Sequence, residues 1–399
     1  MNAEQHVPQF RFKDFSDSWE QRSFKTLYKK VIEKNDLSFE SDRIISVANM
    51  YYKPNDSKSD EKYMETYNIF RLGDIAFEGH KSKNFAYGRF VENTIGDGIV
   101  SHVFDVFRPI SEYDLNYWKY FIHYEDIMGQ KLRMSTTKAT MMNNLVSKDF
   151  LKQSVLVPNL DEQQKIGTFF KQLDHLIALH QRKLAKLKEL KKGYLQKLFP
   201  QNSEKVPEFR FKGYSDAWEK RKVSDYLCES RIPGSNGLKA KKLTVKLWGK
   251  GVVPKNETYS GSIKTKYYVR SANQLIYGKL DFLHAAFGIV PQSLDGWEST
   301  IDSPAFDVNT SIGNAAFLLA LFLKPNFYLR EGIRANGSRK AKRIHEDTFL
   351  SMSISAPQRK EQNQIAMVLD KTEFLIAATQ CKLDLLKKLK KGYLQKMFC

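Results

Sequence analysis

The chain has 399 residues, enough for two or three domains, and its 42% hydrophobic content argues against disorder. Its longest apolar run, residues 315–323, is too short to cross a bilayer, and residues 1–13 lack the apolar core of a signal peptide. The net charge of +19 favours a polyanionic partner over a merely solvated basic surface or an anionic membrane.

Cysteine is sparse. Cys228, Cys381 and Cys399 form neither a disulfide framework nor a zinc-ligand spacing. Such usage is typical of a reducing compartment, so we expect a cytoplasmic location.

The chain begins with a pattern that it repeats 199 residues later. Val-Pro, Phe-Arg-Phe-Lys and Trp-Glu occur in this order within residues 7–20 and again within residues 206–219. Lys-Lys-Gly-Tyr-Leu-Gln-Lys likewise occupies residues 191–197 and 390–396. We therefore predict a tandem duplication in which two domains, residues 1–158 and 200–357, are each followed by a long helix, residues 159–199 and 358–399.

Between the repeated ends, the two halves share only an outline. Residues 70–77 and 269–277 alternate in polarity, which predicts a strand in each half. Core helices are expected near residues 115–127 and 312–323. The domains therefore share one α+β fold with mixed short strands but present different side chains. Two surfaces on one fold suit two ligands of the same class, with drift after the duplication as the alternative.

Two long helices are predicted at residues 162–199 and 361–398, where apolar residues recur at intervals of three and four. A helix of about 57 Å is typical of a coiled coil, and each apolar stripe is the partner that the other needs. Gly193 and Gly392 are expected to mark where the coil ends. The predicted seam contains Ile166, Phe170, Leu173, Ile177, Leu184, Leu187, Ile365, Leu369, Ile376, Leu383 and Leu386.

The sequence contains no recognisable catalytic motif. It lacks Walker-type and dinucleotide-binding glycine loops, an Asn-Pro-Pro-aromatic motif, a His-Glu-x-x-His helix and cysteine pairs with zinc spacing. Residues 60–62, Asp-Glu-Lys, are the nearest approach to a nuclease cluster and are interpreted as a solvated loop. We therefore predict no catalytic residue and no metal ligand. A free-standing enzyme acting on nucleic acid and a coiled-coil adaptor with a basic surface stay open as alternatives.

Basic, polar loops are the positive signal for binding. One loop precedes the last strand of each half, and another follows the shared strand. Lys and Arg neutralise phosphates, while Arg, Asn and Lys can also pair with base edges. Ordinary exposed loops are the alternative, but the matched placement in both halves argues against it. The candidate DNA-binding residues are Lys81, Lys83, Asn84, Arg89, Arg133, Thr136, Thr137, Lys138, Asn143, Asn144, Lys264, Lys266, Lys279, Arg334, Asn336, Ser338, Arg339, Lys340, Lys342 and Arg343.

Each half passes into its long helix through Pro-x-x-x-Glu-Gln-x-x-Ile, beginning at Pro158 and at Pro357. Together with the Phe-Arg-Phe and Trp-Glu starts and the Lys-Lys-Gly-Tyr-Leu-Gln-Lys ends, this pattern resembles the specificity subunits of type I restriction–modification enzymes. The resemblance covers essentially the whole chain. Gly73-Asp74 fits the family's strand pattern, whereas residues 273–274, Asn-Gln, depart from it, so we expect this landmark to be degraded in the second half.

The resemblance implies a non-catalytic subunit that recognises double-stranded DNA. Each domain would be a target recognition domain for one half of a split target, and the two helices would pack antiparallel as a spacer. Two modification subunits using S-adenosylmethionine would bind this scaffold, and restriction subunits using ATP and Mg would join them. No cofactor is expected in this chain. Equal antiparallel helices would also relate the halves by a pseudo-twofold axis, which suits the local symmetry of duplex DNA.

Overall fold

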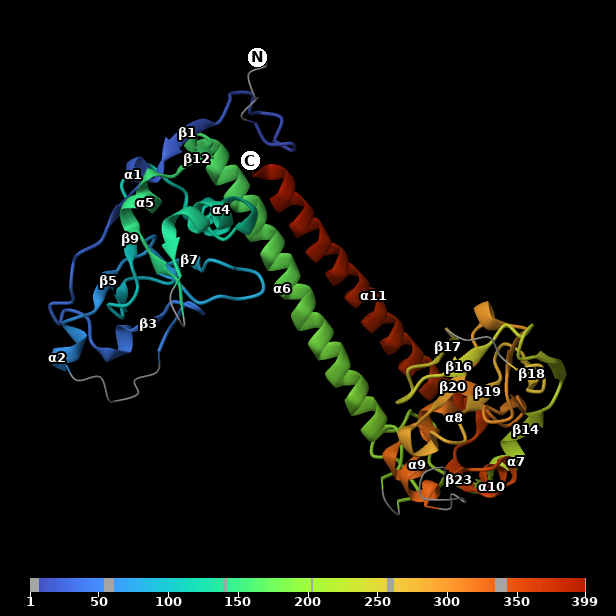
Figure 1. The fold of residues 1–399 in the computed structure, drawn as a ribbon. Coiled ribbons are helices and arrows are strands. Elements are labelled where there is room, and N and C mark those ends of the chain that lie inside the picture. The colour runs from blue at the N-terminus through green and yellow to red at the C-terminus, as the bar shows by residue number, and fades with distance from the viewer. Residues whose placement is uncertain are drawn as a thin grey trace. The chain divides into compact units, whose positions relative to one another are not determined.

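The computed structural model describes residues 7–53, 61–138, 142–201, 204–256, 262–333 and 343–398. The chain forms two compact units (Figure 1). Unit 1 comprises Met1–Arg182 and Cys381–Cys399, and unit 2 comprises Lys183–Gln380. The two long helices are therefore shared, because each begins in one unit and ends in the other.

A four-stranded antiparallel sheet with the order β2-β9-β6-β7 forms the centre of unit 1. A separate pair, β1 and β12, joins the start of the domain to the strand that precedes α6. The strands are β1 (Glu20–Ser23), β2 (Tyr28–Lys30), β3 (Ile45–Ser46), β4 (Tyr51–Tyr52), β5 (Asn68–Phe70), β6 (Ile75–Glu78), β7 (Arg89–Glu92), β8 (Gly98–Val100), β9 (Val106–Pro109), β10 (Thr136–Thr137), β11 (Asn144–Leu145) and β12 (Ser154–Val157). The helices are α1 (Phe24–Leu27), η1 (Ser41–Arg43), α2 (Glu61–Met64), α3 (Leu115–Phe121), α4 (Glu125–Ser135), α5 (Ser147–Lys152) and α6 (Leu160–Lys197).

Unit 2 repeats this plan with the sheet β14-β22-β19-β20 and the separate pair β13 and β23. The strands are β13 (Glu219–Lys222), β14 (Leu227–Ser230), β15 (Pro233–Asn236), β16 (Leu243–Val245), β17 (Val252–Pro254), β18 (Lys266–Arg270), β19 (Leu275–Tyr277), β20 (Phe287–Ile289), β21 (Trp297–Ser299), β22 (Ala305–Val308) and β23 (Ser353–Ala356). The helices are α7 (Val223–Tyr226), η2 (Phe282–His284), η3 (Gln292–Leu294), α8 (Ala315–Phe322), α9 (Pro325–Gly332), α10 (Glu346–Ser351) and α11 (Arg359–Met397).

Aromatic side chains fill the core of each unit. In unit 1, Phe24, Phe90, Phe107 and Phe150 are fully buried in one cluster. The corresponding cluster of unit 2 is built around Tyr277, whose ring lies 4.7 Å from that of Phe349. The shared α+β fold predicted from the sequence is confirmed, and the long alternating segments supply its central strands.

The strand predicted in each half is instead two strands with a turn between them. In unit 1, β5 ends at Phe70, β6 begins at Ile75, and Gly73 in the turn has a φ of +90°. The corresponding residue of unit 2 is Asn273, which has a φ of +68°. Because Asn tolerates this left-handed conformation better than most residues with a side chain, the second half forms the turn without glycine.

The residue after each turn position closes the turn in the same way. An Asp74 carboxylate oxygen accepts a hydrogen bond from the backbone N–H of Arg71, and the Gln274 amide oxygen accepts one from Ser271, both at 2.9 Å. The expectation of a degraded landmark is therefore wrong. The residues at these two positions differ between the halves, but the second half forms the same turn.

The long helices run antiparallel in each unit. In unit 1, Lys390 near the end of α11 lies beside the first half of α6, with its Nζ 2.6 Å from Asp174 Oδ1. In unit 2 the roles are exchanged, since Lys191 near the end of α6 forms an ion pair with Glu373 in the first half of α11. The predicted antiparallel pairing is thus present at both places.

The end of each long helix belongs to a hydrophobic core. Leu198 and Phe199, which follow α6, are buried in the main core cluster of unit 2. Met397 and Phe398, at the end of α11, are buried in that of unit 1. Each domain is therefore completed by residues from the other half of the sequence.

The leading segments cover the same helix ends. The backbone N–H of Phe10 donates to the carbonyl of Lys396, and that of Phe209 donates to the carbonyl of Lys197, both at 2.8 Å. The last carbonyls of a helix have no partner within the helix, so these bonds satisfy groups that would otherwise need water.

The helices continue past Gly193 and Gly392, as the predicted ranges require, so the glycines expected to mark the end of the coil do not end the helices. Burial of the apolar residues beyond them holds the last turn in place. Seven predicted seam residues are buried, namely Ile166, Phe170, Leu173, Leu184, Ile365, Leu369 and Leu383, while Ile177, Leu187, Ile376 and Leu386 are half-buried.

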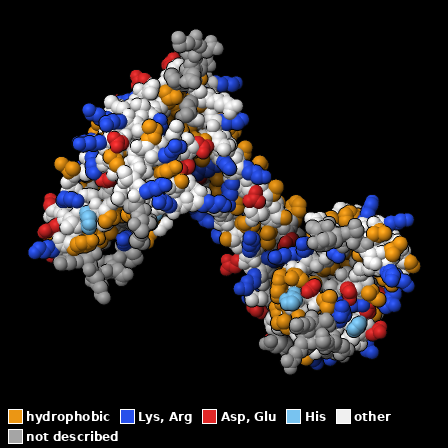
Figure 2. Space-filling view, viewed as in Figure 1, with side chains coloured by type: hydrophobic (Ala, Val, Ile, Leu, Met, Phe, Trp, Pro, Cys, Tyr) orange, Lys and Arg blue, Asp and Glu red, His pale blue; other side chains and the backbone are white. Residues whose placement is uncertain are grey.

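Lys and Arg side chains are spread over the visible surfaces of both units, with Asp and Glu between them (Figure 2). Among the helices in the described part of the chain, none has both the length and the apolar character that a membrane span requires.

Candidate nucleic-acid interface

Two loops of unit 1 that carry candidate residues are joined by Asn143. One loop connects β6 to β7, and the other connects β10 to β11. The backbone N–H of Asn143 donates to the carbonyl of Gly79 at 2.8 Å, and its side-chain amide donates to the carbonyl of Ala86 at 3.3 Å. Asn143 is buried. We therefore assign it to positioning these loops, in place of the direct DNA contact predicted from sequence.

The joined loops and the neighbouring end of α4 expose most of the other candidates in unit 1. They supply four cationic side chains and three neutral polar ones, the mixture that phosphate and base contacts require. The exposed candidates are Lys81, Lys83, Asn84, Arg133, Thr137, Lys138 and Asn144.

Two further candidates in unit 1 are engaged in intramolecular bonds. Arg89 Nε lies 2.6 Å from Glu78 Oε2, and its Nη2 donates to the carbonyl of Ala48 at 2.9 Å. The hydroxyl of Thr136 donates to the carbonyl of Leu132 at 2.8 Å. Arg89 therefore stabilises the β6–β7 hairpin, and Thr136 stabilises the end of α4. Direct contact of these two side chains with DNA stays a prediction.

Two titratable groups packed near the β6–β7 loop favour their neutral forms. Burial raises the pKa of Glu125, which also accepts a hydrogen bond from the backbone N–H of Ala86. Burial lowers the pKa of His123, whose ring lies 6.4 Å from that of Phe85. Both groups thus belong to the partly buried support of the β6–β7 loop.

Unit 2 repeats the junction of the two loops with different residues. The backbone N–H of Ile344, directly after the basic segment, donates to the carbonyl of Lys279 at 3.2 Å. The hydroxyl of Tyr277 donates to the carbonyl of Ile344 at 2.9 Å. Lys279 follows β19 as Gly79 follows β6, so the same two loops meet in both halves.

Lys279 does not reach the surface on which it was predicted. Its Nζ lies 2.6 Å from Glu346 Oε1, and the two side chains are only 4% and 7% exposed. A buried charge without its partner is costly, so this pair is part of the core. We therefore remove Lys279 from the DNA-contact set. Arg343 is half-buried, and its Nε lies 3.3 Å from Asp302 Oδ1.

The remaining candidates of unit 2 fall into two groups. Lys264 and Lys266 are exposed at the start of β18. The others lie outside the described residues, and their contacts with DNA stay predictions: Arg334, Asn336, Ser338, Arg339, Lys340 and Lys342.

Sequence reasoning does not single out the loop at residues 246–251, which joins β16 to β17 and docks on the same surface. Trp248 and Gly249 donate backbone hydrogen bonds to the carbonyls of His284 and Ala285, at 2.8 and 2.9 Å. The available signal is the run Lys-Leu-Trp-Gly-Lys-Gly, with an aromatic residue between two lysines. That run does not reveal where the loop docks, because the docking partners lie more than thirty positions away.

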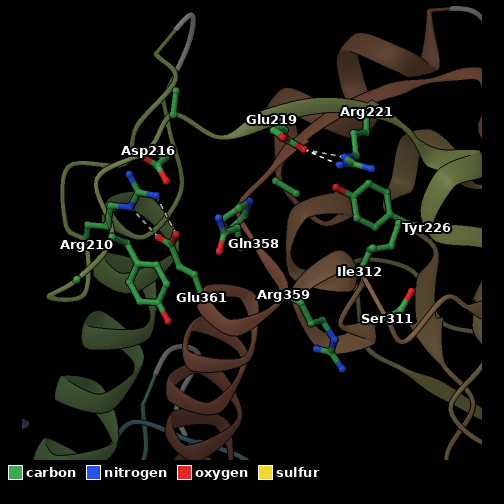
Figure 3. A pocket seen from close by; sticks show the side chains of 15 residues that line it. Arg210, Asp216, Glu219, Arg221, Tyr226, Ser311, Ile312, Gln358, Arg359 and Glu361 are labelled. Atoms are coloured by element: carbon green, nitrogen blue, oxygen red, sulfur yellow. Dashed lines mark hydrogen bonds and ion pairs between the residues drawn. The ribbon is translucent and has the colours of Figure 1, made fainter.

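A cavity of about 620 Å³ in unit 2 adjoins the start of α11 (Figure 3). Two of its arginines are held by carboxylates: Arg210 Nη2 lies 2.9 Å from Glu361 Oε2, and Arg221 Nη2 lies 2.8 Å from Glu219 Oε2. The cavity therefore marks the junction between the leading segment and α11. In the described part of the chain, no group of three His, Cys, Asp or Glu side chains could hold a metal ion.

Residues 7–189 match the family model of the type I restriction modification DNA specificity domain. Residues 7–189 of the chain therefore belong to the type I restriction–modification specificity family. The family match covers the first half, and the 199-residue repeat carries the same pattern into the second.

Solved structures share the fold of this chain over nearly its whole length. The S subunit of the type I system from M. genitalium is 11% identical, with a TM-score of 0.57, and the match covers 98% of this chain and 99% of that one. The HsdS subunit from Thermoanaerobacter tengcongensis is 14% identical, with a TM-score of 0.50 and coverage of 95% and 96%. A chain from a study of complex assembly and conformational transition of the type I R-M system is 13% identical, with a TM-score of 0.50 and coverage of 96% and 98%. No curated protein matches the sequence.

The family matched by residues 7–189 serves DNA specificity in type I restriction–modification systems, and its specificity subunits are non-catalytic. DNA and the methyltransferase and restriction subunits are the partners that such a system implies.

Proposed function

We propose that this specificity subunit reads a bipartite, asymmetric DNA target, with one recognition domain for each half-site. The observation that carries this proposal is the repeated loop junction. In both halves the loop after the central strand is hydrogen-bonded to the chain that follows the basic segment, through Asn143 in unit 1 and Ile344 in unit 2. The hydrogen-bonded junction is present in both halves, whereas the exposed residues around it differ. Two domains that recognise different base sequences would need this combination.

The antiparallel helices α6 and α11 would set the spacing of the two half-sites. α6 alone, with 38 residues, is about 57 Å long, so it is long enough for half-sites centred about 34–36 Å apart. Two modification subunits would bind the scaffold and supply methylation with S-adenosylmethionine, and restriction subunits using ATP and Mg would join them. We expect the assembly to work in the cytoplasm, with all catalysis in the partner subunits.

Domain exchange tests the bipartite reading. Residues 23–158 would be replaced by those of a relative with a known target, and methylated bases would be mapped by single-molecule sequencing in a host that carries the whole system. We expect only one half of the methylated motif to change. The matched exchange of residues 222–357 should change only the other half. A continuous motif, or a change in both halves after either exchange, would overturn the proposal.

Incubation with S-adenosylmethionine and DNA tests the free-standing enzyme. We expect the purified chain to transfer no methyl group until the modification subunits are added. Methyl transfer by the chain alone would favour the alternative.

A further inference from the structure

The tip of the β16–β17 hairpin in unit 2 presents a tryptophan to solvent. The side chain of Trp248 is 55% exposed, whereas Trp19, Trp118 and Trp218 are all at most 5% exposed. An indole is normally placed where much of its large apolar surface is covered. Its exposure here indicates a partner that covers it.

The backbone holds this ring in an unusual but fixed position. Trp248 has a φ of +60°, a left-handed conformation that is disfavoured for an aromatic residue. Its backbone N–H donates to the carbonyl of His284 at 2.8 Å, and the two rings meet edge-on at 5.6 Å. Ala285, on the other side of this contact, also has a positive φ, of +49°. Such outliers persist only where the surrounding structure enforces them, and they occur most often at functional sites.

The charge around the ring identifies the class of partner. Lys246 and Lys250 lie two positions on either side of Trp248, and both are exposed. The β19–β20 loop, on which the hairpin docks, contains Lys279, whose carbonyl accepts a hydrogen bond from the backbone N–H of Ile344 directly after the basic segment. The indole is thus continuous with the loops that form the candidate nucleic-acid interface, and lysines flank it as phosphate contacts would require.

Unit 1 has a related feature at the matching hairpin. β3 and β4 are joined by residues 47–50, Met50 has a φ of +49°, and the adjacent Tyr51 is 47% exposed. The two halves therefore present different aromatic rings from equivalent hairpins. This difference fits two readers with different half-sites.

We propose that Trp248 packs its indole ring against the bases of the second half-site and that Lys246 and Lys250 contact the adjacent phosphates. Apolar side chains that enter a groove can wedge between base steps, and the cost of opening a step depends on its sequence, so the contact favours a particular half-site. Ring contact contributes to target affinity, and the lysines contribute charge that does not depend on sequence. The inference rests on the proposed function, because it adds a contact to one of the two DNA-reading surfaces.

The test compares Trp248→Ala and Trp248→Phe in the full chain with its modification subunits. Two probes are used: a duplex with the target mapped by methylation sequencing, and the same duplex with the second half-site scrambled. We expect Trp248→Ala to lose about tenfold or more in affinity for the target and little for the scrambled duplex, whereas Trp248→Phe keeps most of the affinity. Lys250→Ala should weaken both duplexes equally and reduce the salt slope of binding by about one.

The matched control is Phe374→Ala, which removes a 71% exposed ring from α11 and should leave the affinity for DNA unchanged. If the wild-type chain does not distinguish the two duplexes, the proposed function fails and this inference with it. If the wild type distinguishes them but Trp248→Ala binds the target equally well, only this inference is overturned. If Trp248→Ala kept its affinity for DNA but no longer bound the modification subunits, this inference would be overturned, and Trp248 would be a protein contact instead.

Discussion

Both units have a buried glutamate at the start of a long helix, with an arginine and a tryptophan beside it, but the hydrogen bonds among these side chains differ. In unit 1, Glu162 on α6 receives three hydrogen bonds. Arg11 donates two, each at 2.7 Å, and the indole N–H of Trp19 donates the third at 3.1 Å. The leading segment is thereby fixed to the helix at a buried carboxylate.

Among the described residues of unit 2, only Arg210 donates to the carboxylate of Glu361, with two bonds of 2.9 Å each. The indole N–H of Trp218 is buried without a hydrogen-bond partner in the described structure. The residues that recur in both halves therefore form the same bidentate ion pair, whereas the hydrogen bond from the tryptophan is seen in unit 1 and not in the described part of unit 2.

A second difference lies where the first core helix of each unit meets the long helices. Tyr120 on α3 donates its hydroxyl to Asp174 at 2.8 Å, and the ammonium of Lys390 lies 5.0 Å from the centre of its ring. Unit 2 keeps the corresponding ion pair, between Lys191 and Glu373. The duplication thus preserved this ion pair between the helices at both places.

The tyrosine of this cluster has no counterpart in unit 2. Asp114 and Asn314 cap α3 and α8 in the same way, so Ala320 occupies the place of Tyr120. A groove of about 820 Å³, lined among others by Leu195, Ala320 and Leu323, adjoins the helices there. The framework is therefore held by a few repeated contacts, and the side chains around them were free to diverge.

The largest expected effect comes from removing the aromatic ring that follows each long helix and completes the core of a unit. Phe398→Ala should destabilise unit 1, and Phe199→Ala should destabilise unit 2, each by about 3–5 kcal/mol, because both rings are buried among aromatic neighbours. Hydrogen exchange followed by mass spectrometry would report each unit separately. The exposed Phe374→Ala should stay within about 0.5 kcal/mol of the wild type. If Phe398→Ala instead lost amide protection in unit 2, or Phe199→Ala in unit 1, the assignment of the helix ends to these cores would be refuted.

The next effect sharpens the difference between the two tryptophans. Trp19→Phe should cost about 1.5–3 kcal/mol beyond the loss of ring volume, because its N–H bonds a buried carboxylate. Trp218→Phe serves as the matched control, since the same volume is lost but no hydrogen bond is broken. Chemical denaturation of both variants measures the difference. Equal losses would mean that the bond to Glu162 contributes nothing.

The smallest effect is a dependence on pH that belongs to unit 1 alone. Strand register pairs Ile75 with Glu92 in unit 1 and Leu275 with Ile289 in unit 2, so an apolar side chain replaces the carboxyl. Burial raises the pKa of Glu92 well above its ordinary value. The folded state then holds a proton that the unfolded chain releases, so stability falls as pH rises from the ordinary glutamate pKa towards the raised one.

Glu92→Gln should remove that decline without changing the shape of the side chain. Denaturation of unit 1, followed from pH 4 to pH 8, would show a flatter profile in the variant than in the wild type. Stability that rises with pH in the wild type, or an equal decline in both proteins, would contradict the assignment to Glu92.

The sequence by itself determined the duplication, the helix seams and the family. The 199-residue repeat is visible in the letters, and the apolar spacing of residues such as Ile166 and Ile365 encodes one buried face through the period of the helix. It also placed the lysines of the β6–β7 loop on an exposed surface, because lysines are rarely buried without a partner.

Tertiary structure alone decided which groups meet across the sequence. The burial of Lys279 against Glu346, the role of Asn143 as a joint and the docking of Trp248 on His284 all join residues far apart in the chain. The same holds for Phe398, which completes a core that begins near residue 19. Local spacing fixes the conformation of a segment, but its partner is fixed only by the shape and charge of surfaces that exist once both segments have folded.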